Sequence, residues 1–289
     1  MSDIEERLTF RTAGVIGLGL IGGSVARDLA ALGVRVVAYD RDPATMESAC
    51  AEGVVAEPLG TSLTGLSDAE VVIVAVPVSA LRDVLRAAPP LPLARLITDA
   101  GSTKRSAIMT AEALGIGERF VGSHPMAGDH RSGWAASRRG LFNGAKVYLC
   151  RTRQSCEDAV TGAHDLWRAL GGSPEEIAPD AHDRLLAYAS HLPHAVSAAL
   201  ALTLESAGVT RAALGAGGRD ATRLAGGSVE MWTAIARDNA DDLLPCLVAL
   251  EAHLQRLRAA LERGDEASLR DLFRTARSWS FRDGADGSR

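Results

Sequence analysis

The sequence predicts an α/β protein in which an N-terminal, doubly wound, mostly parallel sheet precedes an all-helical domain. Two observations support this fold class. Strand and helix patterns alternate through the first half of the chain, whereas from about Asp180 onward the sequence has a helical period almost throughout. In addition, Gly17, Gly19 and Gly22 form a G-x-G-x-x-G pattern between an apolar run and a helical pattern. Such an alternation places helices on both faces of the sheet and buries the strands.

The glycine pattern predicts a dinucleotide site of the Rossmann type. The pair Val15-Ile16 predicts the strand before it, and residues 25–32 predict the helix after it. The first glycine permits a tight turn, the second lets the backbone approach a pyrophosphate, and the third lets the helix pack closely on the strand. A second apolar strand, 34–39, ends at Asp40, whose carboxylate would accept hydrogen bonds from a ribose diol and repel a 2′-phosphate. We therefore expect NAD, although Arg41 could partly accommodate that phosphate.

The residues expected to contact the cofactor come from the glycine turn and from neighbouring strand ends. They are Gly17, Gly19, Leu20, Ile21, Gly22, Asp40, Arg41, Val76 and Ser102. The helix that follows the turn would add free N–H groups and a positive dipole end for the phosphates.

Further strands and helices follow in alternation. The run 70–77 is continuously apolar and is closed by Pro77, which is typical of a strand buried on both faces. The other predicted strands are 96–99, 120–122 and 147–150, and the predicted helices are 43–52, 78–88 and 107–114. In a sheet of this kind, ligands bind at the carboxyl ends of the strands.

The second half predicts long apolar helices. A broad apolar stripe runs from Leu185 to Leu204, with Pro193 inside it as a kink, and a second runs from 243 to 261. A helical domain of this size cannot cover so much apolar surface alone, so we expect a homodimer. The expected domains are residues 1–178 and 179–282, with a disordered tail over 283–289.

Composition is that of a globular protein with a small-molecule ligand. The 289 residues carry a net charge of −5, which disfavours nucleic acid or an anionic membrane as partner. The apolar stretches are interrupted short of a membrane span, and the acidic N-terminus lacks a signal-peptide pattern. The four cysteines are scattered without metal-site spacing, so we expect reduced thiols, no metal and a cytoplasmic location.

Two clusters of residues that could take part in catalysis follow predicted strands. In the first, Asp99 to Lys104, either Ser102 or Thr103 could cap the next helix, or Ser102 could contact substrate and cofactor. In the second, 122–128, His124 stands just past a strand and Pro125 holds it extended. A histidine at the edge where the cofactor lies is a candidate general base, although a lone histidine is more often structural.

A third cluster lies in the helical half. His191 and His194 stand on adjacent helical turns, where they form either a polar seam or, less plausibly without other ligands nearby, a metal pair. Arg219 and Arg223 have glycine-rich flanks, which favour close approach to a bound ligand, and a guanidinium is the natural partner of a carboxylate. The alternative is an ion pair with an acid such as Asp220.

Taken in order, these motifs resemble the prephenate and arogenate dehydrogenases of tyrosine biosynthesis. The matching segments are residues 17–24, 99–104, 122–128, 190–194 and 219–225. The resemblance implies oxidative decarboxylation of a cyclohexadienol by a Rossmann domain and a helical dimerisation domain. It implies that His124 takes the proton of the ring hydroxyl and that Ser102 orients His124 and touches the same hydroxyl. Arg223 would then hold a substrate carboxylate, and His191 would add a polar contact.

One loop departs from the family pattern. Many members carry Ser or Thr and then Glu after the 122–128 motif, where this chain has Asp129 and His130, followed by Arg131. His130 and Arg131 favour a keto acid such as prephenate, whereas Asp129 could favour the ammonium group of arogenate or of a ring-amino analogue of prephenate. We expect prephenate, with His130 and Arg219 as further substrate contacts.

Two more distant readings make separate predictions. A β-hydroxyacid dehydrogenase would carry a catalytic lysine in the helical half, and residues 180–289 contain no lysine. A cofactor-binding sensor without turnover would be expected to lack the set His124, Ser102 and Arg223, and all three are present.

Overall fold

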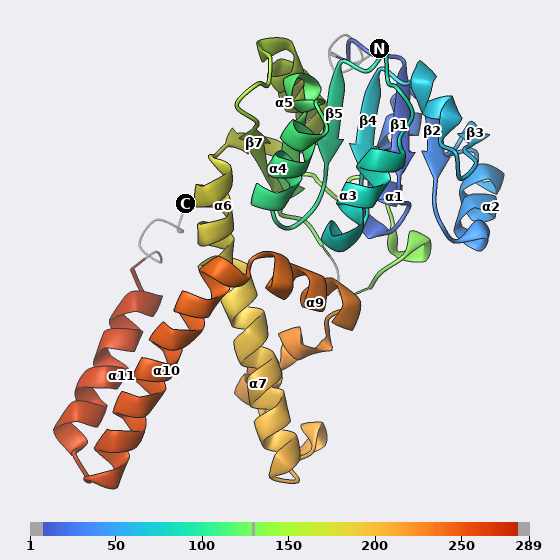
Figure 1. Ribbon diagram of the computed structural model, residues 1–289. Coiled ribbons are helices and arrows are strands. Elements are labelled where there is room, and N and C mark those ends of the chain that lie inside the picture. The colour runs from blue at the N-terminus through green and yellow to red at the C-terminus, as the bar shows by residue number, and fades with distance from the viewer. Residues whose placement is uncertain (1–7, 129–130, 283–289) are drawn as a thin grey trace. The chain divides into compact units, whose positions relative to one another are not determined.

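A parallel five-stranded sheet forms the centre of the N-terminal part (Figure 1). The computed structural model describes residues 8–128 and 131–282. The strands of this sheet stand in the order β3-β2-β1-β4-β5, so the chain moves outward from β1 in both directions, as a doubly wound fold requires. Their bounds are β1 Thr12–Ile16, β2 Arg35–Tyr39, β3 Glu57–Pro58, β4 Val71–Val74 and β5 Leu96–Asp99.

Helices cover both faces of this sheet, which explains the continuous apolar runs. Along β1, Val15 packs with residues of α1, α2 and α5, and its neighbour Ile16 packs with residues of α3 and α4 on the opposite face. All four residues of β4 are buried for the same reason. The helices are α1 Leu20–Ala31, α2 Pro43–Ala51, α3 Val78–Ala87, α4 Arg105–Ala113 and α5 Glu157–Ala169.

A second, three-stranded sheet extends the first beyond β5. It comprises β6 Val121–Pro125, β7 Lys146–Arg151 and β8 Ser173–Glu176, and a parallel bridge between Ile97 and Phe120 joins it to β5. Strand β6 is antiparallel to β7, with His124 opposite Tyr148. The predicted strand 120–122 was too short, because β6 continues through His124 to Pro125. His124 is therefore held inside a strand by ladder hydrogen bonds and does not stand in the turn that follows it.

The helical half begins with one continuous run over Pro179–Ser206. It comprises α6 Pro179–Leu186, a π-helical turn Ala187–His191 and α7 Leu192–Ser206. The expected kink at Pro193 takes the form of this π turn, since proline has no N–H to donate back into the preceding turn. By length and composition alone this run could cross a membrane, contrary to the sequence prediction, although a single helix of this kind is weak evidence.

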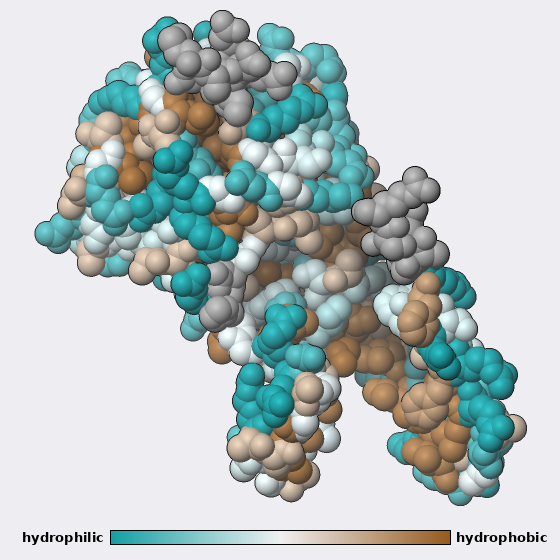
Figure 2. Space-filling model, turned by 180° about the vertical axis from the view of Figure 1, so that it is seen from behind, coloured by the Kyte–Doolittle hydropathy of each residue, from teal (hydrophilic) through white to brown (hydrophobic). Residues whose placement is uncertain are grey.

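The remaining helices are α8 Ala216–Ala221, α9 Val229–Asp238, α10 Ala240–Glu262 and α11 Glu266–Ser280. Contacts divide the chain into a compact unit of residues 1–240 and a second unit of 241–289, which holds the α10–α11 hairpin. Figure 2 shows apolar side chains gathered along this hairpin. Its exposed apolar residues are Leu244, Val248, Leu254, Leu261, Phe273 and Trp279. The predicted tail 283–289 lies outside the described residues.

Candidate active site

The glycine turn between β1 and α1 is shaped to receive a phosphate group. Gly17 has a φ of +89°, and a Cβ on Gly22 would lie 1.9 Å from the Gly17 carbonyl oxygen, so both positions require glycine. A Cβ on Gly19, in contrast, would meet no atom within 4 Å. Gly19 is the N-cap of α1, and no side chain caps the helix there. The open space and the free N–H groups fit the predicted pyrophosphate site.

Asp40 follows β2 and is tied to the same turn. Its Oδ2 accepts a hydrogen bond from the Leu18 backbone N–H at 2.7 Å, and its Oδ1 accepts one from the Asp42 N–H at 2.9 Å. A carboxylate has further lone pairs, so Asp40 can still accept from a ribose hydroxyl. Arg41 beside it is exposed, and Val76, just after β4, packs close to Gly17. These positions are compatible with the predicted cofactor contacts.

The segment after β5 is organised around a buried ion pair. The Lys104 side chain is fully buried and its ammonium group pairs with the Asp99 carboxylate. Neither Ser102 nor Thr103 caps α4, contrary to one expectation. The Asp183 carboxylate takes that role, since it accepts from the backbone N–H groups of Lys104 and Arg105 at 2.8 and 2.9 Å.

The two hydroxyl residues of this segment have different environments. Thr103 is 1% exposed, and its hydroxyl donates to the Asp238 carboxylate. Ser102 remains partly exposed at the carboxyl end of β5. Because its hydroxyl is not used as a helix cap, Ser102 is free for the predicted contact with substrate and cofactor.

His124 takes part in a chain of hydrogen bonds that begins at a buried carboxylate. Its Nδ1 lies 2.9 Å from Nε2 of His182, and Nδ1 of His182 lies 2.7 Å from Oδ1 of Asp183. His182 and Asp183 are 0% and 1% exposed, whereas His124 is only partly buried. The arrangement leaves Nε2 as the ring nitrogen of His124 that can meet a ligand.

Electrostatics keep His124 neutral. Burial, helped by the nearby His182 and the Lys104 ammonium group, holds the pKa of His124 well below its ordinary value of 6.5. The pKa of His182 is lowered for the same main reason. Burial alone would raise the pKa of Asp183, but hydrogen bonds from His182 and from the N-terminus of α4 bring it below the ordinary value. His124 is thus a neutral imidazole linked through His182 to an ionised carboxylate, and such a group can accept a proton at neutral pH.

His191 lies in the π-helical turn and is almost completely buried. Its Nδ1 accepts from the Asn239 side-chain amide at 3.1 Å, and its exposed fraction is 2%. Burial lowers its pKa to about 4, so it is neutral. Its Nε2 is buried and has no hydrogen-bond partner among the residues that the structure describes. A ligand group or a water could therefore satisfy this atom.

His194, one turn further, is the more accessible of the two histidines. Its ring stacks on Trp232 with centroids 3.4 Å apart. Burial lowers the pKa of His194; the backbone of Leu224 opposes this shift and the positive charge of Arg223 adds to it, so the start of the Arg223–Gly226 turn lies beside the ring. Arg223 is exposed, and within the described ranges no carboxylate pairs with it, so the expected alternative of an ion pair with Asp220 is not seen.

The positions of Arg219 and His130 in the structure give less support to their predicted contacts with the substrate. Arg219 is exposed, and its guanidinium donates to the Leu214 carbonyl oxygen. His130, like Asp129, lies outside the described residues.

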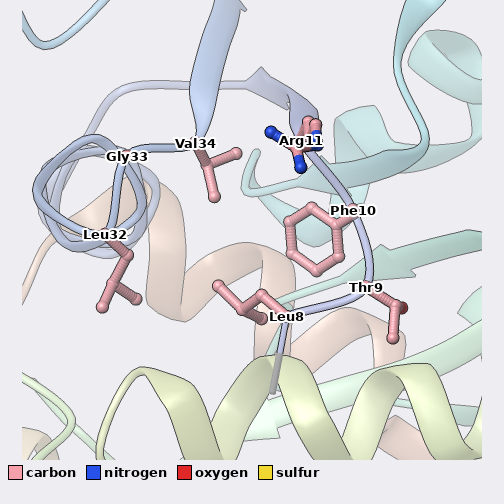
Figure 3. Close-up of a pocket in the computed structure, with 7 residues that line it drawn as sticks. All are labelled: Leu8, Thr9, Phe10, Arg11, Leu32, Gly33 and Val34. Carbon is pink, nitrogen blue, oxygen red and sulfur yellow. The ribbon is translucent and has the colours of Figure 1, made fainter. Parts of the chain in front are cut away.

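The pocket in Figure 3, lined by Leu8 to Arg11 and Leu32 to Val34, lies at the amino ends of β1 and β2, opposite the ligand edge.

Sequence reasoning missed four residues that organise this site. They are His182, Asp183, Trp232 and Asn239, each of which contacts one of the predicted histidines or the start of α4. A local pattern could have drawn attention to His182 and Asp183, because they stand four and three residues before Leu186 and so share the buried face of α6 with it. No comparable pattern marks Trp232 or Asn239.

Comparisons with known proteins agree with this architecture. Residues 25–175 match the family model "Prephenate dehydrogenase, nucleotide-binding domain", and residues 178–275 match "Prephenate dehydrogenase, dimerization domain". A prephenate dehydrogenase of Bacillus subtilis is 33% identical over 278 residues, which cover 93% of this chain and 74% of that protein.

Solved structures give the same result. The prephenate dehydrogenase of Aquifex aeolicus in complex with hydroxyphenyl propionate and NAD+ superposes with a TM-score of 0.84 at 29% identity, covering 96% of this chain and 99% of that one. The arogenate dehydrogenase of Synechocystis has a TM-score of 0.76 at 28% identity, with coverage of 92% and 98%. This chain, with its nucleotide-binding turn and its histidine site, belongs to the prephenate dehydrogenase family.

Proposed function

We propose that this protein catalyses the NAD-dependent oxidative decarboxylation of prephenate to 4-hydroxyphenylpyruvate in tyrosine biosynthesis. The observation that carries the proposal is the state of His124. It is a neutral, partly exposed imidazole at the ligand edge of the sheet, and its second nitrogen is hydrogen-bonded to His182. The removal of a hydroxyl proton at neutral pH needs a base of this kind.

Each predicted site residue has a chemical task in this reaction. His124 would accept the proton of the ring hydroxyl through Nε2, and Ser102 would contact the same hydroxyl. Arg223 would pair with a substrate carboxylate, while His191 and Arg219 would add polar contacts. NAD, when bound at the glycine turn, supplies the acceptor for the hydride. Loss of carbon dioxide makes the ring aromatic, so the site needs no separate electron sink.

Arogenate is the second candidate substrate. Asp129 favours it, since a carboxylate near the side chain of the substrate would pair with an ammonium group, and the similarity to a solved arogenate dehydrogenase is consistent with it. His130 and Arg131 favour the keto acid.

A direct assay separates the two. NADH production is measured with prephenate and with arogenate side by side, and His124→Asn serves as the inactive control. We expect the higher kcat/KM with prephenate. A preference for arogenate would transfer the function to that substrate, and no turnover with either would refute the proposal.

We also propose that the protein is a homodimer of the cytoplasm. Only 22% of the apolar window in the run Pro179–Ser206 is buried in a single chain, and the α10–α11 hairpin exposes six large apolar side chains. The match to a dimerization domain supports a second copy as the cover. The division into domains of residues 1–178 and 179–282 remains our proposal. Its boundary falls one residue inside the second matched model, which begins at residue 178, three residues after the first model ends.

A further inference from the structure

Asp183 is connected to two different histidines of the site. Through its carboxylate it is bonded to His182, and through His182 to His124. Through its backbone carbonyl it accepts from the Asn239 side-chain amide at 2.8 Å, and the same amide nitrogen lies 3.1 Å from Nδ1 of His191. Both branches are buried, so the direction of each hydrogen bond is constrained by the donors and acceptors available.

The first branch determines which nitrogen of His124 carries its proton. An ionised carboxylate can only accept, so Nδ1 of His182 must be the protonated nitrogen. A neutral His182 then has a lone pair on Nε2, and the hydrogen bond at 2.9 Å requires Nδ1 of His124 to donate. His124 is left with an unprotonated Nε2.

The second branch has the opposite outcome. The Asn239 amide nitrogen has two N–H groups and no lone pair to offer, and one of the two goes to the Asp183 carbonyl. The other must be donated to His191, so Nδ1 of His191 accepts and its Nε2 carries the proton. That Nε2–H is the buried atom without a partner among the described residues.

We propose that Asp183 is a positioning residue that sets the two histidines in opposite tautomers, with His124 as an acceptor and His191 as a donor at Nε2. The carboxylate is held for this purpose by the Lys104 and Arg105 N–H groups at the start of α4. The assignment of a hydroxyl proton to His124 and of an acceptor group on the substrate to His191 rests on the proposed function. The tautomers themselves do not depend on it.

Other charged groups reach the same histidines. His124 faces His182 from α6, Lys104 from the segment after β5 and His191 from the π turn, and His182 in turn is acted on by Asp183 and Asp99. Lys104 disfavours protonation of His124, and the carboxylates of Asp99 and Asp183 act on His182 in the opposite sense. A change in pH dependence alone would therefore not identify Asp183, and the test must observe the tautomers directly.

The test is nitrogen-15 NMR of the imidazole rings in the full chain at neutral pH without substrate. Long-range proton–nitrogen correlations distinguish a protonated Nδ1 from a protonated Nε2. The signals of His124 and His191 are assigned by their loss in His124→Asn and His191→Asn. We expect protonated Nδ1 in His124 and protonated Nε2 in His191. Protonated Nε2 in His124 of the unaltered chain would overturn the proposal.

Asp183→Asn tests whether the Asp183 carboxylate determines the tautomer of His124. The amide can donate to His182 and so reverse that ring, which would place the proton of His124 on Nε2 and lower kcat by on the order of 10²-fold or more. Asp180→Asn is the matched control, because it removes the same charge from the exposed start of α6 and should change neither tautomer nor kcat. A folded Asp183→Asn chain with an unchanged His124 tautomer would refute the role of Asp183.

A second pair of variants keeps the test decisive if Asp183→Asn does not fold. In His182→Gln the side-chain oxygen can accept from His124 and the nitrogen can donate to Asp183, so the tautomer and most of kcat should survive. In His182→Leu both should be lost. Equal losses in the two variants would contradict the relay. Failure of the proposed function is a separate outcome, since it would appear as absent turnover in the unaltered chain while the tautomers stay as predicted.

Discussion

The glycine turn allows cofactor binding and folding to be perturbed separately. In Gly19→Ala the new methyl group meets no protein atom within 4 Å, and the φ of −67° at this position suits alanine. We expect the free energy of unfolding to change by no more than about 0.5 kcal/mol. The methyl group would, however, occupy the space in which the pyrophosphate approaches the backbone. The Kd for NAD should therefore rise at least about tenfold, equivalent to roughly 1.4 kcal/mol.

Gly22→Ala should instead reduce the stability of the fold. Its methyl group would lie 1.9 Å from the Gly17 carbonyl oxygen and 2.8 Å from Cβ of Ala75, so the backbone itself must move. Overpacking of this kind costs about 1–3 kcal/mol or more, which for a chain of this size lowers Tm by roughly 2–12 °C.

Calorimetric melting and NAD titration on the same variants test both statements. Gly162→Ala is the control. It lies inside α5, its methyl group would have an ordinary 3.9 Å contact with Leu96, and it should stabilise the helix by up to about 1 kcal/mol without affecting NAD. A stable Gly19→Ala protein with an unchanged Kd for NAD would refute the assignment of this turn to the pyrophosphate.

The other expectations concern the site and its pH dependence. His124→Asn should lower kcat by on the order of 10²-fold while NAD binding survives, and near-normal turnover of this variant would remove His124 from the mechanism. In the unaltered enzyme the acid limb of kcat/KM should lie well below pH 6.5, because a lowered pKa keeps His124 neutral there. Arg223→Ala should raise KM at least about 30-fold, because loss of a carboxylate partner costs roughly 2–5 kcal/mol, while NAD affinity and Tm stay unchanged. Arg223→Lys should recover part of the loss. An unstable Arg223→Ala variant with an unchanged KM would refute this role. NAD should be preferred over NADP at least about tenfold in kcat/KM because Asp40 repels a 2′-phosphate, and a preference for NADP would overturn that reading. The free energy of unfolding should fall as pH drops from 6.5 to about 4, because over that window the unfolded chain binds protons that the buried neutral histidines do not. The part due to His191 should reach about 3 kcal/mol and should be absent in His191→Asn. Urea unfolding that is independent of pH across this window would contradict the burial of a neutral His191.

Short-range patterns in the sequence predicted the parallel sheet and the glycine turn at which we propose that the cofactor binds. Val15 and Ile16 point to opposite faces of β1 because side chains alternate along any strand, and Gly17 is required because its φ is positive. Both properties depend only on a residue and its neighbours in the chain. The sequence also predicted the strand that carries His124, although it ended that strand at Gly122 and placed His124 just after it.

What the sequence could not show depends on contacts between distant segments. Asp183 acts across long separations in the chain, since its neighbour His182 meets His124 at a separation of 58 residues and the start of α4 is 79 residues away. The same side chain replaced Ser102 and Thr103 as the cap of α4, and β6 ran past Gly122 because β7 was available to pair with it.

The sequence by itself therefore determined the order of strands and helices, the glycine turn and the histidine that stands at the ligand edge. These follow from hydrophobic periodicity and from the conformations open to single residues. Only the tertiary structure decided which groups surround that histidine. A buried polar group takes whichever partner packing brings within reach, and packing joins segments without regard to their separation along the chain.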